Sequence, residues 1–306
     1  MQNTLKSPVI FDGVGLHTGT AVRMVVRPAS AGHGIWFRRT DIQLGNALVP
    51  AQWDVVERSP LCTKLVNASG VSVSTVEHVM AALAGCGIHN ALVEINGPEV
   101  PVLDGSSIRF VRGLVAAGLR DMDAPIAVIE ITRAIQVVQG DAVACLSPAT
   151  GVSMSFEIDF PDAAIGHQQK SLDLSNGAFV RELSDSRTFC RRADVEAMQA
   201  AGLALGGTYD NAVVVDGPRV LSTGGLRHPD EAVRHKMLDA LGDLATAGMP
   251  ILGHYRGQKA GHALTNKLLR ALFATPDAWR IRTADAQLAD RLPGAGLGQT
   301  DLEAVA

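Results

Sequence analysis

One segment, residues 231–248, restricts how this chain can fold more than any other part of the sequence. It reads EAVRHKMLDALGDLATAG, and its apolar residues recur every three or four positions, which is the spacing of an amphipathic helix. The apolar stripe consists of Val233, Met237, Leu241 and Leu244. Because such a stripe must be covered by another layer, the segment predicts a helix packed inside a layered fold.

The polar face of the same helix is a candidate metal site. His235 and Asp239 are one helical turn apart, and an imidazole and a carboxylate so placed are a ready pair of ligands for a divalent metal. Lys236 and Asp243 add charge beside them. His-x-x-x-Asp is a short pattern with many accidental matches, so a partly exposed helix that binds nothing is the ordinary alternative.

The overall composition limits the classes of function. The chain has 306 residues, of which 47% are hydrophobic and 19% charged, as is usual for a globular protein with room for two domains. Only 4% are aromatic, so the core must be aliphatic and rich in alanine. The net charge of −4 supplies no general field for nucleic acid, and we expect no nucleic-acid partner.

The sequence also predicts a cytoplasmic monomer that does not insert into membranes. The first residues, MQNTLKSPVIFDG, lack the apolar run of a secretory signal, and no uncharged apolar run reaches the roughly 18 residues of a membrane span. The cysteines are scattered and predict free thiols: Cys62, Cys86, Cys145 and Cys190. Any bound metal must therefore be held by histidines and carboxylates.

The order of predicted elements is similar in the two halves of the chain. The first half contains strands at 20–28, 34–39 and 90–96 and helices at 74–87 and 107–118. The second half contains strands within 126–138, 141–148, 152–160, 211–217 and 250–257 and helices near 177–186, 192–202, 231–248 and 263–274. The candidate linker between the halves is residues 121–128, where Pro125 would end any continuing helix. We therefore predict an α+β fold of two similar domains, 1–124 and 125–306, with a loose tail from Asp285.

Two further segments place titratable residues where the pattern favours apolar ones. Ser74 and Glu77 have the spacing of a capping box, which leaves His78 on an apolar helix as either a core histidine or a metal ligand with Glu77 as a general base. His262 follows Gly261 at the start of a helix and is either a loop histidine or a proton donor held by a carboxylate such as Asp243. The Gly-rich turn around His17 matches no phosphate-binding motif and is set aside.

Several stretches together resemble one family, the zinc-dependent UDP-3-O-acyl-N-acetylglucosamine deacetylases of bacterial lipid A synthesis. The matching stretches are GVGLHTG (13–19), STVEHVMAALAG (74–85), PEVPVLDGSS (98–107), SRTF (186–189), GLALGG (202–207), VRHKMLDALGDL (233–244) and GHALTNKLL (261–269). They occur in the family's order and span nearly the whole chain, which makes the resemblance far more specific than any single motif.

The resemblance implies a role for each candidate residue. It implies Zn²⁺ as the cofactor, with His78, His235 and Asp239 as ligands and Glu77 as the base for metal-bound water. It makes His262 the general acid, Asp243 its orienting partner, and Thr188 a donor to the oxyanion. The substrate-binding residues that it implies are Lys236, Lys259, Asp159, Phe160, Phe189 and Gly207.

The resemblance also implies an architecture and a substrate. Each domain is a sheet plus helices with a small insert, and the helices lie between the two sheets. The second insert, about 190–218, forms a channel for the acyl chain of UDP-3-O-(3-hydroxyacyl)-N-acetylglucosamine. Arg191 and Arg192 depart from the apolar residues expected there, and Asp185 and Ser186 are also unusual beside the oxyanion site.

Two alternatives stay open at this point. Another zinc amidohydrolase would keep the metal site and act on a different N-acyl sugar or small amide. A binding module with a structural metal would instead close the fourth coordination position and lose its fold on chelation.

Overall fold

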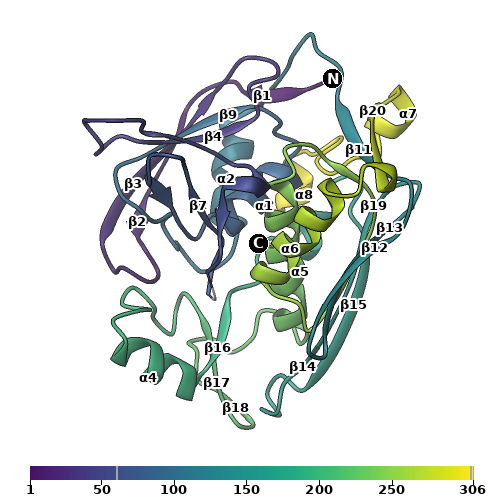
Figure 1. Cartoon of the computed structure of the whole chain (residues 1–306). Helices are drawn as coiled ribbons and strands as arrows, with labels where there is room; N and C mark the ends of the chain where they lie inside the picture. The colour runs from purple at the N-terminus through teal and green to yellow at the C-terminus, as the bar shows by residue number, and fades with distance from the viewer. Residues whose placement is uncertain (60, 304, 306) are drawn as a thin grey trace.

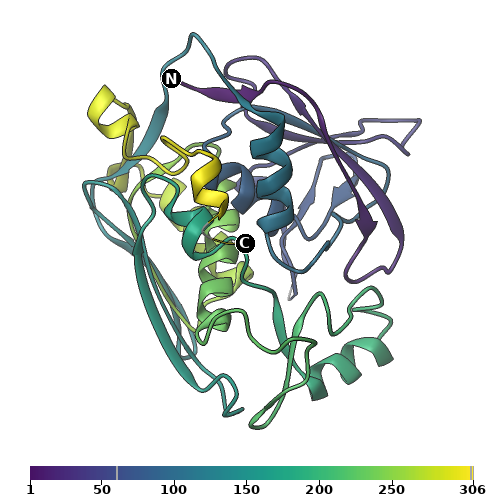
Figure 2. The same ribbon diagram turned by 180° about the vertical axis from the view of Figure 1, so that it is seen from behind.

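The computed structural model describes residues 1–59, 61–303 and 305, and the fold is α+β, as predicted. Two large sheets form outer layers, and the longer helices lie between them (Figure 1, and from behind in Figure 2). These helices are α1 (Glu77–Gly85), α2 (Ile108–Ala117), α5 (Glu231–Ala245) and α6 (His262–Phe273). The predicted helices at 74–87, 107–118, 231–248 and 263–274 are thereby confirmed.

The first sheet has five strands in the order β2-β3-β9-β4-β5. In β3, Val22, Met24 and Val26 are buried and alternate with Arg23 and Arg27 on the exposed face, which is the period of a sheet covered on one side. Strand β4 runs parallel to β9, and the other pairs are antiparallel. The strands are β2 (Val9–Val14), β3 (Ala21–Pro28), β4 (Ile35–Arg39), β5 (Leu48–Pro50) and β9 (Ala91–Ile95).

The second sheet has seven strands, and β19 pairs with β11, β13 and β14. Two of its strands, β15 and β20, were not predicted. Strand β15 (HQQKSLD) has no buried residue and therefore carries no apolar signal. The strands are β11 (Ala127–Ile131), β12 (Ile135–Gln139), β13 (Ala142–Ser147), β14 (Val152–Asp159), β15 (His167–Asp173), β19 (Ile251–Gln258) and β20 (Trp279–Thr283).

Smaller elements complete the described chain. Figure 1 shows α4 and strands β16 to β18 standing apart from the two large sheets. This projecting unit comprises β16 (Phe189–Arg191), α4 (Arg192–Ala200), β17 (Val213–Asp216) and β18 (Arg219–Val220). The other small elements are β1 (Asn3–Leu5), η1 (Trp53–Val55), β6 (Val56–Glu57), β7 (Lys64–Val66), β8 (Ser72–Val73), β10 (Leu119–Asp121), α3 (Ala178–Glu182) and η2 (Pro276–Ala278).

Helices α1 and α5 touch backbone to backbone at the centre of the molecule. A Cβ atom on Gly242 would lie 2.0 Å from the carbonyl oxygen of Glu77, so any larger residue would push the helices apart. Val233 and Met237, which belong to the apolar stripe predicted for this helix, are fully buried. The close approach places the polar residues of both helices at one point.

Two predictions were wrong. Helix α1 begins at Glu77 with Val76 at its N-cap, and the Glu77 carboxylate accepts the Thr63 amide instead of closing a capping box with Ser74. The tail after Asp285 is not loose: α7 (Ala286–Ala289) is capped by the Asp285 carboxylate, and α8 (Gln299–Glu303) is tied to α3 by an Arg181–Asp301 ion pair. Residues 304 and 306 of the tail lie outside the described residues.

Across the described residues, no helix combines the length and the apolar character that crossing a membrane requires.

Candidate metal centre

Three potential metal ligands from two helices meet between the sheets. His78 lies in the first turn of α1, and His235 and Asp239 lie one turn apart on α5. Asp239 Oδ1 is 3.6 Å from His78 Nε2 and 3.2 Å from His235 Nε2. All three side chains are buried, and their ligand atoms lie within 4.8 Å of one another. The structure thus adds a third ligand to the pair that the helical spacing suggested.

The donor set fits a zinc ion. His235 Nδ1 lies 2.9 Å from the Ser186 carbonyl oxygen, which can only accept, so Nδ1 donates to it and Nε2 is directed at Asp239, where it could bind a metal. Asp239 Oδ1 is buried and has no hydrogen-bond partner among the described residues. Both measured separations are below about 4.2 Å, twice the zinc–nitrogen distance of ~2.1 Å. These three residues could therefore hold one zinc ion and leave a fourth position open.

Glu77 lies beside this triad with one oxygen fixed. Its Oε2 accepts the Thr63 backbone N–H at 3.0 Å, and its Oε1 is 3.8 Å from His262 Nε2. Burial raises the pKa of Glu77, against the attraction of the neighbouring imidazoles of His262 and His78. A carboxylate with a raised pKa and one free oxygen is suited to accept a proton near neutral pH.

His262 is held by a carboxylate on α5. Its Nδ1 is 2.9 Å from Asp243 Oδ2 and 3.2 Å from Oδ1, and Thr63 Oγ1 donates to the same Oδ1. Burial alone would lower the pKa of His262, but the charges of Asp243, Glu77 and Asp239 outweigh it and raise the pKa to about 9. The ring is thus protonated at neutral pH, and its Nε2–H faces Glu77 and the metal triad.

Asp239 remains ionised in the same buried cluster. Burial would raise the pKa of this carboxyl group, but the attraction of His235 and Lys236 outweighs it and holds the pKa well below its usual range. Lys236 Nζ is 3.3 Å from Asp239 Oδ2, so this lysine already has a carboxylate partner at the site. An ionised carboxylate is the form that binds a metal.

A cavity of about 1130 Å³ opens onto the triad and gathers most of the predicted substrate residues. Its walls include Phe160, Thr188, Phe189, Gly207, Lys236 and Lys259, together with His235, Asp239 and His262. The Phe160 and Phe189 rings meet edge to face with centroids 5.3 Å apart. Asp159 is not among the lining residues; it is exposed and lies 3.4 Å from Lys259 Nζ.

The projecting unit forms one wall of this cavity. Val195 and Met198 line it, while Leu203 and Leu205 are exposed and do not. The unusual Arg191 and Arg192 also line the cavity, and their guanidinium groups pair with Asp162 and with Glu196 and Asp216. These ion pairs explain how the arginines are accommodated beside apolar side chains.

The other two unusual residues are Asp185 and Ser186. Asp185 pairs with His228 at 2.9 Å, and Ser186 supplies the carbonyl that orients His235. The Asp185 carboxylate is therefore engaged by His228.

Sequence reasoning missed two residues at this site. Thr63 contacts both Glu77 and Asp243 from a loop whose sequence carries no recognisable pattern. His17, set aside earlier, lines the cavity, and both of its ring nitrogens are buried without a partner among the described residues. Glu99 fixes its loop by accepting the backbone N–H groups of His17 and Thr18. A buried imidazole without partners could have been found only from the fold.

Comparison with known proteins agrees with this geometry. Residues 2–274 match the family described as LpxC, UDP-3-O-acyl N-acetylglycosamine deacetylase. The chain belongs to this family. A relative from Phenylobacterium zucineum is 50% identical over 94% of this chain and 99% of its own length. Relatives from Pasteurella multocida and Shewanella oneidensis are 46% and 44% identical over 93% and 96% of this chain, and 93% and 97% of their own lengths.

All three relatives are named UDP-3-O-acyl-N-acetylglucosamine deacetylase. LpxC is a family of metal-dependent amidohydrolases in lipid A biosynthesis, and this chain is accordingly an enzyme of the deacetylase class. The family membership predicted from the seven sequence stretches is confirmed.

Proposed function

We propose that this enzyme hydrolyses the acetamide of UDP-3-O-(3-hydroxyacyl)-N-acetylglucosamine, giving the free amine and acetate in the committed step of lipid A biosynthesis. The observation that carries the proposal is the buried triad of His78, His235 and Asp239, with Glu77 and His262 facing it, in a chain of the LpxC family. A structural metal site has no use for an adjacent base and acid, which argues against the binding module.

His78, His235 and Asp239 would hold Zn²⁺. A zinc ion at such a site polarises a bound carbonyl and lowers the pKa of water toward about 7. Glu77 Oε1 accepts a proton from the attacking water as the new C–O bond forms at the acetyl carbon. Thr63 fixes the other oxygen, Oε2, so the carboxylate keeps its free oxygen toward the site.

His262 supplies the proton that the departing nitrogen needs. When the C–N bond breaks, the protonated Nε2 gives its hydrogen to the amine, and Asp243 keeps the ring oriented through Nδ1. Thr188 lines the same cavity and would donate to the carbonyl oxygen as negative charge develops there. One water is consumed, and one amine and one acetate are released.

The remaining residues suit the substrate's other parts. Lys236 and Lys259 would bind its anionic portion, Asp159 and Phe160 the uridine, and Phe189 and Gly207 the sugar side of the cavity. The acyl chain would extend past Val195 and Met198 along the insert at about 190–218. We propose the same division of the chain as before, 1–124 and 125–306, with the site between the halves.

The decisive test combines metal analysis with turnover. The purified chain should contain zinc and deacetylate UDP-3-O-acyl-N-acetylglucosamine, lose activity on chelation while keeping its far-UV circular dichroism, and recover with zinc. Activity only on a non-nucleotide amide would favour the other amidohydrolase. Loss of fold on chelation would favour a structural metal.

Substrates with graded acyl chains test the channel. A rate that depends on chain length supports the insert as its binding site, and a rate independent of length contradicts it. Free thiols at all four cysteines are consistent with the cytoplasmic location, and we propose a monomer. Sedimentation at micromolar concentration would test the oligomeric state.

A further inference from the structure

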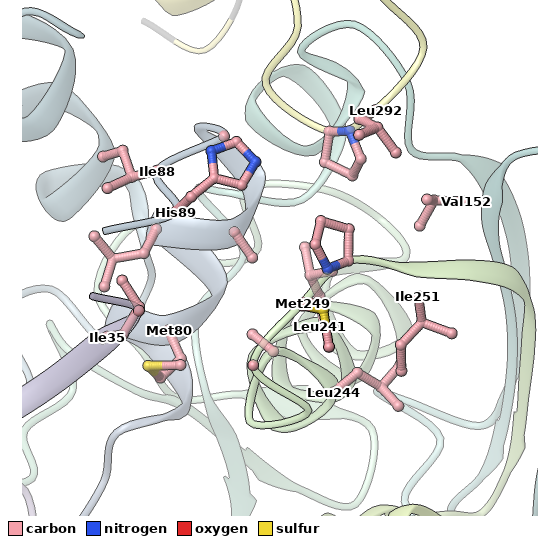
Figure 3. A pocket seen from close by; sticks show the side chains of 18 of the residues that line it. Ile35, Met80, Ile88, His89, Val152, Leu241, Leu244, Met249, Ile251 and Leu292 are labelled. Atoms are coloured by element: carbon pink, nitrogen blue, oxygen red, sulfur yellow. The ribbon is translucent and has the colours of Figure 1, made fainter. Parts of the chain in front are cut away.

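A second cavity lies behind the metal centre, toward the C-terminal ends of α1 and α5 (Figure 3). Its volume is about 380 Å³. Met80 and Leu241 line it, and each follows a metal ligand by two residues, so the same two helices separate it from the catalytic cavity. Strands of both large sheets and the segment at Leu292 complete its walls.

The lining is uncharged and mostly aliphatic, with neutral polar side chains such as Gln52, Asn90 and Ser153 among it. Figure 3 shows Ile35, Ile88, Leu244, Met249 and Ile251 around the space. Among the described residues that line it there is no Asp, Glu, Lys or Arg. Because the lining offers an ion no opposite charge, the cavity favours an uncharged molecule.

One polar group at the edge, His89, can donate a hydrogen bond into the cavity. The Asn3 backbone N–H donates to His89 Nδ1 at 3.0 Å, which places the ring hydrogen on Nε2. Burial lowers the pKa of His89 to about 4, so the ring is neutral. No described residue accepts a hydrogen bond from Nε2, and Figure 3 shows the ring beside the cavity. A ligand atom that accepts a hydrogen bond would satisfy this donor.

The volume sets the size of the ligand. An apolar cavity of ~150 Å³ holds one benzene molecule, so a space about 2.5 times larger holds roughly 15 carbon atoms. We propose that this cavity binds an uncharged, mainly aliphatic molecule of about 10–15 heavy atoms whose polar end accepts a hydrogen bond from His89. The proposal does not depend on the proposed function, because the two cavities have no lining residue in common.

Methionine methyl groups provide a direct test in the unmodified protein. Met80, Met154 and Met249 line this cavity, whereas Met198 lines the catalytic one. In protein labelled with ¹³C at the methionine methyls, 1-decanol should shift the first three signals saturably, while the Met198 signal reports separately on decanol that enters the proposed acyl channel. Shifts confined to Met198, or no saturable shift up to the solubility limit of decanol, would overturn the proposal.

Substitutions that fill the cavity give a second test. Ala84→Leu and Ala245→Leu should each weaken decanol binding at least about tenfold, the effect of excluding two methylene groups. Ala212→Leu, the matched change in the catalytic cavity, should leave unchanged the affinity that the Met80, Met154 and Met249 signals report. Wild-type affinity in both filled variants would contradict the assignment. If a filled variant does not fold, the methyl shifts of the unmodified protein decide alone.

Discussion

The two cavities lie on either side of α1 and α5 and differ in the charge of the residues around them. On the metal side, Glu77, Asp239, Asp243 and His262 are packed into one charged cluster. On the other side, no described lining residue carries a formal charge. Buried charges that face one another favour chemistry and cost stability, whereas aliphatic packing does the reverse. Substitutions at the metal centre should therefore change activity more than stability, and substitutions in the second cavity should do the reverse.

The largest effect on activity is expected from Glu77→Gln, in the charged cluster at the metal centre. Removing the base should lower kcat/KM by about 10²–10⁴-fold while zinc stays bound, and should leave the free energy of unfolding equal or higher. Steady-state kinetics and urea unfolding measure the two quantities. The surface control Glu57→Gln should change neither. A Glu77→Gln enzyme with native kcat/KM would remove the proposed base.

Leu83→Ala, in the second cavity, should lower stability and leave activity nearly unchanged. Leu83 is 1% exposed and lines the second cavity, so its truncation should lower the free energy of unfolding by about 2–5 kcal/mol. Metal content and kcat/KM at 25 °C should stay within a few-fold of the native values. Leu44→Ala, at a leucine that is 91% exposed, is the matched control. Equal losses of stability in both variants would show that the second cavity is not part of the core.

The pH dependence of the free energy of unfolding should report on His89, which lines the second cavity. Its pKa is lowered in the folded state to about 4 from 6.5, so the unfolded chain takes up this proton first as the pH falls. The stability that depends on the neutral ring is complete above pH 6.5 and is lost as the pH falls toward 4, by at most about 3 kcal/mol. In His89→Gln the fall in stability from pH 6.5 to 4 should be shallower, and in the exposed His167→Gln unchanged. An identical slope in His89→Gln would contradict this.

The smallest effect is expected from Thr63→Val, which removes one hydroxyl from the charged side. The variant keeps the backbone N–H that fixes Glu77 but loses the hydrogen bond to Asp243. A loss of about tenfold in kcat is expected, as for other groups that orient a functional side chain, with KM little changed. Thr63→Ser should restore the native rate. If valine and serine behave alike, the hydroxyl does not position His262.

The sequence predicted the main helices because their apolar periodicity is strong. It also predicted two of the three candidate metal ligands directly, since the spacing of His235 and Asp239 is a property of one helix. His78 could not be joined to that pair by spacing, because it lies on a different helix; the family resemblance supplied it, and the contact at Gly242 shows how the two helices meet.

The failures have a common physical origin in tertiary contacts. Ser74 and Glu77 have a capping-box spacing, but the Glu77 side chain bonds to Thr63, which is distant in the local pattern. The tail after Asp285 lacks periodicity, yet Leu288 and Leu292 are buried against the rest of the fold. Local patterns do not report such contacts, and these regions therefore needed the structure.

The division of the triad between α1 and α5 also bears on how the enzyme is made. His78 and His235 are separated by 157 positions (235 − 78). At about 5–20 residues per second, the ribosome adds His235 roughly 8–30 s after His78. During that interval the nascent chain would hold one of the three proposed ligands and could not retain a metal ion tightly. On the proposed site, metal capture would therefore wait until α5 has docked on α1, which would make it a late step in folding.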